Sequence, residues 1–448
     1  MLQLITYITI AIAIFLAYKS KERMGYALGL MWSMYAWEQL VQQGNAFLLQ
    51  RGSLINIGLT LLAILAILFA YPRGELRHFR FQPPHLCVIG LLSLAVASSL
   101  WTISPKDTEE QLRLMAPYLF AFVLVCPFLA QNPRAIKDAI NVTIYFGGLV
   151  LLGLLFSKIG SRGVILTRVG GVNVEGNPLA TASYAGIVAI CTGFSVYNDR
   201  TNKALLLLKL AIVALALWTV VRSGSRGQMV ALVVSTLLML PLTARLAVRR
   251  STIMPLLTIA IFCGAAIWAI DHYDLSARWR WVSINGAREG RFQMVIRLLE
   301  VWASGGPFTW IGGLGSSSSF RIVGFYPHCV PPEVLAELGL VGFALLVMFV
   351  VGVTNRGLAF LKSTSIDPST RLLIGTLFTM FFFDALLSLK QGSFLGSPFF
   401  LCHGISIALA CSTAHLYKHD DVVNLPKRMG GTRRARLANT ATSGDAAR

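Results

Sequence analysis

The sequence predicts an all-α, polytopic helical membrane protein with about 12–13 transmembrane helices and one large loop outside the membrane. Three observations lead to this fold class. The composition is too apolar for a soluble domain, since 55% of the 448 residues are hydrophobic and only 13% are charged. Apolar stretches of about 20 residues, long enough to cross a bilayer, recur along the chain. Helices are their expected form, because unpaired backbone groups are not tolerated in hydrocarbon.

The apolar stretches form thirteen candidate spans between the first residue and residue 416. The first span has no basic segment before it and no small-residue cleavage site, so we expect it to be retained rather than removed as a signal peptide. Merging one weak early span would leave twelve and would move the amino terminus to the other side. The candidate ranges are 2–18, 24–41, 53–71, 85–101, 112–130, 135–156, 178–197, 204–221, 228–244, 252–270, 333–353, 371–389 and 396–416.

The connections between these spans form two alternating sets that differ in their content of basic residues. One set holds 23 of the 39 Lys and Arg residues, and the positive-inside rule places it in the cytoplasm. It includes the connections at 19–23, 72–84 and 354–371 and the basic tail after residue 417. The other set then faces outward, together with the amino terminus.

This layout divides the chain into four regions. The longest outward connection is the only one with room for a small subdomain outside the membrane, and it is rich in arginine and tryptophan. The polar and basic tail is expected to be disordered. The regions are 1–270 with ten spans and short loops, 271–332 with the large outward loop, 333–416 with the C-terminal spans, and 417–448 with the tail.

The charge balance indicates anionic partners. The chain carries 39 Lys and Arg against 20 Asp and Glu, a net charge of +19, which suits membrane lipid head groups or a phosphorylated or acidic substrate. Nucleic acid is not an expected partner of a chain that lies mostly in a membrane. Six of the seven cysteines fall within candidate spans and only Cys329 lies in a loop, so we expect no disulfide framework and no metal site.

Seven of the arginines on the outward side are candidates for anion binding, because the positive-inside rule does not require basic residues there. A guanidinium stays charged and binds phosphate through two parallel hydrogen bonds, so several arginines at a membrane surface suit the diphosphate of a lipid. For a single arginine, the alternative is that the side chain reaches toward lipid head groups. The seven are Arg162, Arg168, Arg222, Arg226, Arg288, Arg291 and Arg321.

Two pairs of these arginines have distinctive sequence contexts. Arg222 and Arg226 flank a tight Gly and Ser turn in the sequence VRSGSRGQ, which keeps them near the bilayer edge, and Ser225 is placed to cap the next helix. Arg288 and Arg291 lie three residues apart in NGAREGRFQMVIRLLEVW. This segment predicts a helix start at residue 285, with both arginines on one face as an anion clamp.

Among the seven histidines, His328 has the most informative context, in the sequence GFYPHCVPPEVLAELGLVG. The Pro-Pro pair is expected to start a helix directly after it, with Glu333 in the first turn and Glu337 one turn later. An imidazole with a pKa near 6.5 accepts a proton from a hydroxyl at neutral pH, as the general base of glycosyl or acyl transfer does. The alternative is an interfacial histidine bonded to the backbone.

Together these residues resemble the bacterial O-antigen ligase and O-antigen polymerase family, membrane glycosyltransferases of the C-type fold. Family members carry His, ten residues and Gly-x-x-Gly, and here His328 is followed at this spacing by Gly339 and Gly342. Cys329 stands where the family usually has Asn, Ser or Gln. Weaker similarity extends over 98–113, 168–178, 221–228, 289–302 and 310–318.

The resemblance implies a specific reaction on the periplasmic side of the bacterial inner membrane. A glycan on undecaprenyl diphosphate would be transferred to an acceptor hydroxyl with inversion, without a nucleotide sugar, a metal or another cofactor. His328 would activate the hydroxyl as the general base. The diphosphate would be bound by Arg222, Arg288 and Arg291. The weaker site candidates are Arg168, Arg226 and Glu337.

Three functions remain open on the sequence. A ligase would place the finished glycan on lipid A core, and the spacing from the histidine to the glycines favours it. A polymerase would extend the lipid-linked glycan by the same chemistry, and RVGG followed by Asn-Pro also occurs among exopolysaccharide polymerases. Transport of an anion or of a lipid-linked glycan belongs to another class, whose sites usually lie near the midplane. Lys209 and Asp384 are the candidate intramembrane charges for it.

Overall fold

The computed structural model describes residues 1–43, 45–51, 53–73, 76, 80–157, 165–169, 172–198, 202–244, 264 and 281–428. Within these ranges the chain is almost entirely helical, as the sequence predicts. The predicted span at 252–270, except residue 264, and residues 429–448 of the predicted tail lie outside the described residues. Residues 417–428, which the sequence predicts as disordered, instead continue the last helix.

Nine helices in the described part of the chain are long and apolar enough to cross a membrane. Two of them continue through a short helical segment, α6 into η1 (Ser98–Leu100) and α7 through η2 (Phe120–Val125) into α8 (Cys126–Leu129). The nine are α1 (Leu2–Ser20), α6 (Pro83–Ala97), α7 (Pro105–Leu119), α9 (Pro133–Leu155), α10 (Pro178–Asn198), α11 (Lys203–Arg222), α12 (Arg226–Ala244), α18 (Val330–Lys362) and α19 (Pro368–Ser388).

The other predicted spans within the described residues are shorter or broken helices. α5 (Ser53–Ala70) and the first half of α20 (Pro398–Arg428) are apolar but shorter. α2 (Gly25–Trp32) and α3 (Met34–Gln42) together fill the span predicted at 24–41. The short helices are α4 (Ala46–Gln50), α16 (Pro307–Gly312) and α17 (Ser318–Val323), and α15 (Trp281–Ala303) is the long helix of the large loop.

A two-stranded antiparallel hairpin is the one departure from the predicted all-α fold in the described residues. β1 (Ile165–Val169) pairs with β2 (Val172–Glu175), with Val169 opposite Val172. Both strands are rich in β-branched residues, and a Gly-Gly pair lies between them in the sequence, which is typical of a hairpin. The pattern of apolar stretches does not predict it, because the strands have only five and four residues.

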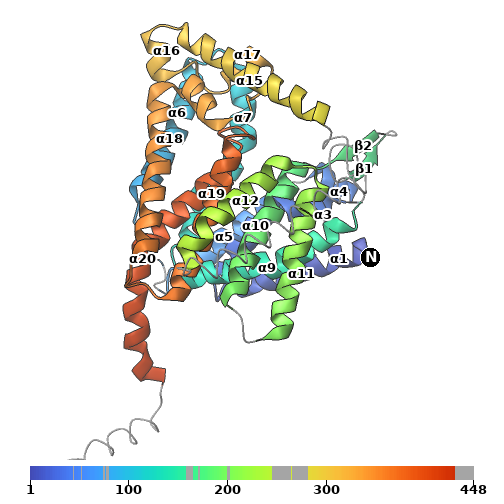
Figure 1. Cartoon of the computed structure of the whole chain (residues 1–448), viewed down its shortest axis with the longest axis vertical. Coiled ribbons are helices and arrows are strands. Elements are labelled where there is room, and N and C mark those ends of the chain that lie inside the picture. The colour runs from blue at the N-terminus through green and yellow to red at the C-terminus, as the bar shows by residue number, and fades with distance from the viewer. Residues whose placement is uncertain are drawn as a thin grey trace, which may run out of the picture.

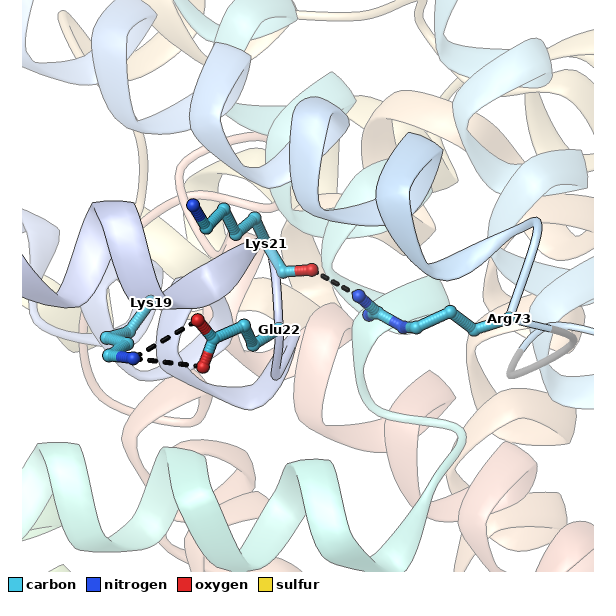
Figure 2. Close-up of polar contacts among 4 residues, drawn as sticks. All are labelled: Lys19, Lys21, Glu22 and Arg73. Carbon is cyan, nitrogen blue, oxygen red and sulfur yellow. Dashed lines mark hydrogen bonds and ion pairs between the residues drawn. The ribbon is translucent and has the colours of Figure 1, made fainter.

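Connections that the charge count groups together meet at one end of the bundle. After α1, Arg23 donates from Nε to the carboxylate of Asp138 in α9 at 2.7 Å. Beside it, Arg73 after α5 donates to the carbonyl of Lys21 (Figure 2). Three connections that are far apart in the sequence are therefore neighbours in space, as the alternating count predicts. We call this end the basic end.

The large loop forms the opposite end. Figure 1 shows α15, α16 and α17 gathered at one end of the molecule, while α20 extends from the other end. In the interior, α2 crosses α9 at close range, because a Cβ atom on Gly25 or Gly29 would collide with the α9 backbone or Val142. Such Gly-x-x-x-Gly contacts are a usual means of helix association in membranes.

A break in α18 joins the large loop to the bundle. Gly339 has a φ of +67° inside α18, so the helix is interrupted two residues after Glu337. The carbonyls of Ala336 and Glu337 accept instead from the backbone N–H groups of Leu314 and Gly315, each at 2.9 Å. Broken helices are tolerated at membrane depth where protein satisfies the freed backbone groups. The turn at Leu314 and Gly315 therefore supports the start of α18, which follows His328 in the sequence.

Candidate functional site

A cavity of about 1250 Å³ lies between α10, α12, α15, α19 and the residues before α18. His328 lines it together with three basic side chains from separate parts of the chain: Arg226 of α12, Arg291 of α15 and Lys390 after α19. None of the described residues that line it is Asp or Glu. Positive charges that line a cavity with low-dielectric walls attract anions. We call this space the cationic cavity.

His328 is held between aromatic rings in a backbone conformation that is rare for its residue type. Its φ is +59°, in the left-handed region. Its ring centroid lies 4.6 Å from that of Tyr326 and 5.4 Å from that of Phe325. Burial lowers the pKa of His328 below the usual value of 6.5, and the charge of Arg291 lowers this pKa further. The imidazole is therefore neutral at pH 7, the form that accepts a proton.

Lys390 lies over the turn between α11 and α12. A Cβ atom at Gly227 would collide with the Lys390 side chain, so the glycine in VRSGSRGQ leaves the space that the lysine occupies. Burial lowers the pKa of Lys390 to about 8, and the charges of Arg291 and Arg226 contribute to this shift. The three cations therefore lie close enough to repel one another, and a bound dianion would relieve the repulsion.

Polar side chains fix the loop that carries Lys390. Gln228 is fully buried, and its Nε2 donates to Oε1 of Gln391 and, at 3.4 Å, to the carbonyl of Leu179. Gln391 donates in turn to the hydroxyl of Ser183 at 3.3 Å. These bonds tie α10, α12 and the loop after α19 together, so the position of the lysine depends on all three segments.

The last residues of the stretch at 168–178 line the cationic cavity, whereas Arg168 at its start is not among the described residues that line it. Asn177 lines the cavity, and its Oδ1 accepts from the N–H of Leu179 at 2.9 Å at the start of α10. Arg168 lies in β1, and its side chain is outside the described part of the structure. Its role as a weaker candidate stays a prediction.

Arg288 and Arg291 lie in one helix, as the sequence predicts, but this helix begins earlier than expected. α15 starts at Trp281, so residue 285 is inside a helix rather than at its start. Arg291 lines the cationic cavity. Arg288 precedes it by three residues and therefore lies on the same helical face, although the described part does not include its side chain.

Arg222 is not brought together with the other basic residues. Its guanidinium donates to the carbonyl of Leu155 and, at 3.4 Å, to that of Ser157, and it does not line the cationic cavity. The cap expected from Ser225 is also not found, because its hydroxyl is buried without a hydrogen bond in the described structure. Of the two arginines at this turn, Arg226 is the one at the cavity.

The two glutamates at the start of α18 bind backbone groups of neighbouring loops. Glu337 accepts from the N–H groups of Ser317 at 2.7 Å and Ser319 at 3.1 Å. Glu333 accepts from the N–H of Phe394 at 3.1 Å. Both side chains are buried, and neither lines the cationic cavity. Glu337 thus holds the start of α17, so this weaker site candidate lies away from the cationic cavity.

A smaller cavity of about 330 Å³ adjoins the cationic cavity at His328. His328, Asn177 and Leu179 line both spaces. The described residues around the smaller space include the carboxylate of Asp384 but neither Lys nor Arg. We call this space the neutral cavity. His328 therefore separates a space that attracts anions from one that does not.

Both candidate intramembrane charges are hydrogen-bonded within the bundle. Asp384 in α19 lies 2.7 Å from Nδ1 of His403 in α20. Lys209 in α11 donates to the hydroxyl of Ser195 at 2.6 Å, and Lys209 and Ser195 line a third cavity of about 400 Å³. That cavity lies near the end of α10 opposite His328, so Lys209 and Asp384 do not share one path across the bundle.

Lys390 is the cavity residue that the sequence analysis did not single out. The signal that identifies it is the same one that identifies the outward arginines. It is the only basic residue in the connection between the spans predicted at 371–389 and 396–416, and this connection belongs to the outward set. The positive-inside rule does not require a lysine in this connection, so Lys390, like the outward arginines, is a candidate for anion binding.

Among the described residues, no group of three or more His, Cys, Asp or Glu side chains is placed to hold a metal ion. Comparison of the chain with known protein families and with curated proteins finds no match. The function is therefore inferred from the site itself.

Proposed function

We propose that this chain is a glycosyltransferase of the O-antigen ligase type in a bacterial inner membrane. It would move a glycan from undecaprenyl diphosphate to an acceptor hydroxyl, such as one of lipid A core, at the periplasmic face. The observation that carries the proposal is the convergence of a neutral imidazole with three cations. His328, Arg226, Arg291 and Lys390 line one cavity, although the chain supplies them from four separate segments.

The chemistry divides between the histidine and the cations. The acceptor hydroxyl gives its proton to the free ring nitrogen of His328 while its oxygen bonds to the anomeric carbon. The bond from that carbon to the diphosphate oxygen breaks, and undecaprenyl diphosphate leaves with the bonding electrons. Arg226, Arg291 and Lys390 stabilise the charge that develops on the leaving group.

The proposed site differs from the sequence prediction in its basic residues. Arg291 and, by its helical face, Arg288 are kept as diphosphate ligands. Arg226 and Lys390 take the place of Arg222, whose donors bind backbone carbonyls. Arg222 would then support the turn that presents Arg226, by tying it to the end of α9.

A polymerase remains the second candidate, and one observation favours it. The end of the stretch RVGG followed by Asn-Pro lines the cationic cavity through Asn177 and Pro178. A polymerase would carry out the same transfer with a second lipid-linked glycan as the acceptor. The two functions therefore differ in the acceptor and not in the reactive groups.

Product analysis with purified protein tests the proposal. The protein is incubated with undecaprenyl-diphosphate-linked glycan and either lipid A core or a second portion of the donor, and products are identified by mass spectrometry. Undecaprenyl diphosphate should be released in step with glycosylated lipid A core, and a ladder of longer lipid-linked glycans would instead identify the polymerase. Absence of release with either acceptor, from protein that binds the donor, would refute a transferase.

A further inference from the structure

The neutral cavity next to His328 has no assigned role, although it contains an unusual set of groups for a space within a membrane bundle. Its walls combine the carboxylate of Asp384, the amide of Gln111 and the rings of Tyr35 and Tyr326. Intramembrane carboxylates are costly and commonly functional. A volume of about 330 Å³ is in the range of small-molecule sites and suits one sugar ring rather than a lipid chain.

Charge distinguishes the two cavities that meet at His328. The cationic cavity has three basic side chains and no described Asp or Glu, whereas the neutral cavity has Asp384 and no described Lys or Arg. A diphosphate would be attracted to the first and repelled from the second. Sugar hydroxyls donate well to carboxylates and exchange hydrogen bonds with amides, so the neutral cavity suits a polyhydroxylated ligand.

Asp384 keeps acceptor capacity that its bundle partner does not use. Its Oδ2 lies 2.7 Å from Nδ1 of His403, which is fully buried. His403 in turn packs edge-on against Trp32 with ring centroids 5.4 Å apart, so the carboxylate orientation is fixed from behind. This contact uses only Oδ2, and Asp384 lines the neutral cavity, so its carboxylate has acceptor capacity for a ligand hydroxyl.

We propose that the neutral cavity is the acceptor subsite, which binds the sugar ring that carries the reacting hydroxyl. The inference rests on the proposed transferase function and extends it. Inverting attack requires the acceptor and the departing diphosphate to lie on opposite sides of the anomeric carbon. Two cavities that meet at the general base provide these two sides. Asp384 and Gln111 are the residues that would hold the acceptor ring.

Kinetics with varied acceptor test this assignment. Asp384→Asn and Gln111→Ala should each raise the acceptor KM about tenfold, the cost of a hydrogen bond to a buried site, and should leave the donor Kd unchanged. Glu109→Gln is the matched control, because Glu109 is an exposed acidic residue on the same helix as Gln111. It should behave as wild type. Gln111→Ala keeps the test valid if Asp384→Asn does not fold.

Direct binding separates this inference from the proposed function. Binding of lipid A core that lacks O-antigen is measured on purified protein without donor. If the wild type transfers glycan but neither variant changes the acceptor KM or Kd, the subsite is refuted and the function stands. If the wild type binds this acceptor through Asp384 and Gln111 but releases no undecaprenyl diphosphate, the transferase function fails while the subsite stands. A shift in donor Kd equal to that in acceptor KM would also overturn the assignment.

Discussion

At the scale of single residues, the proposed site consists of side chains that come together only in the folded chain. Lys390 and Gly227 show this most clearly, because the lysine occupies space that a Cβ atom on the glycine would fill. Gly227 of the VRSGSRGQ segment therefore leaves room for the charged side chain of Lys390, which is more than 160 positions away in the sequence. Burial and the two arginines make that charge costly to hold, as the lowered pKa of Lys390 shows.

Gly227→Ala should therefore displace Lys390 without unfolding the protein, because the atoms in its way belong to the end of a flexible side chain. Loss of one charge-assisted contact should weaken donor binding about tenfold. Lys390→Met should have the same effect, and the double variant should be no worse than either one. Donor affinity is measured by titration, with Gly193→Ala as control, since no atom lies within 4 Å of a Cβ there. Additive losses in the double variant would contradict the account.

On the acid side, the pH dependence of the transfer rate should reflect the protonation of His328. Because burial and Arg291 lower its pKa, the imidazole loses its ability to accept a proton only as pH falls through a value below 6.5. Removing the charge with Arg291→Gln removes one cause, so the acid limb of kcat/KM, which reflects groups of the free protein, should move upward toward 6.5. The rate is measured with both substrates well below their KM values. A limb that stays in place, or moves downward, would mean that another group is the base.

At the scale of elements, the break in α18 determines how the large loop meets the bundle. Gly313, Gly315 and Gly339 all have positive φ angles, of 78°, 92° and 67°. A Cβ atom at Gly339 would collide with the carbonyl of Ile311. The Gly-x-Gly turn and the Gly-x-x-Gly segment therefore form one backbone junction. This explains in physical terms why the sequence carries glycine in both segments.

A second set of bonds ties this junction to the stretch at 98–113. The carbonyl of Ser316 accepts from the hydroxyls of Thr102 at 2.7 Å and Thr108 at 2.5 Å. Its N–H donates to the hydroxyl of Ser98 at 2.9 Å. Two stretches more than 200 residues apart are thus joined directly by hydrogen bonds.

Gly339→Ala should destabilise this junction. Forcing a side chain into the left-handed region costs about 1–3 kcal/mol, and the collision with Ile311 adds to that cost. The thermal midpoint in detergent should fall and transfer should be lost. Gly306→Ala is the matched control in the same loop, since its φ is −81° and no atom lies within 4 Å of an added Cβ. Equal stability of both variants would show that the junction is not formed.

At the scale of the whole molecule, the spans were predictable and the site was only partly so. Apolar length is set by the solvent, because every crossing must satisfy its backbone in lipid, and this leaves a strong pattern in the sequence. The place of Arg222 and Lys390 depends on contacts between distant segments, such as Gln228 with Gln391, which leave no local pattern. His328 and Arg291 were found because their spacing and charge are themselves local.

The membrane topology of the whole molecule can also be measured. Ser304 is exposed in the large loop and Thr364 is exposed between α18 and α19. A cysteine at Ser304 should react with an impermeant maleimide from the periplasm, and one at Thr364 only after the membrane is opened. Both are introduced in a chain whose seven cysteines are replaced. Labelling of Thr364→Cys in intact cells would reverse the assignment of sides.

The central claim is that His328 takes the acceptor proton while other residues hold the donor. Donor binding and glycan transfer by purified His328→Asn protein, measured in parallel with wild type, test it most directly. Asparagine tolerates the left-handed backbone of this position, so the loop should keep its shape. We expect an unchanged donor Kd and transfer reduced by about 10²–10⁴-fold, the usual range for a general base. Transfer at the wild-type rate, with donor bound normally, would contradict the account.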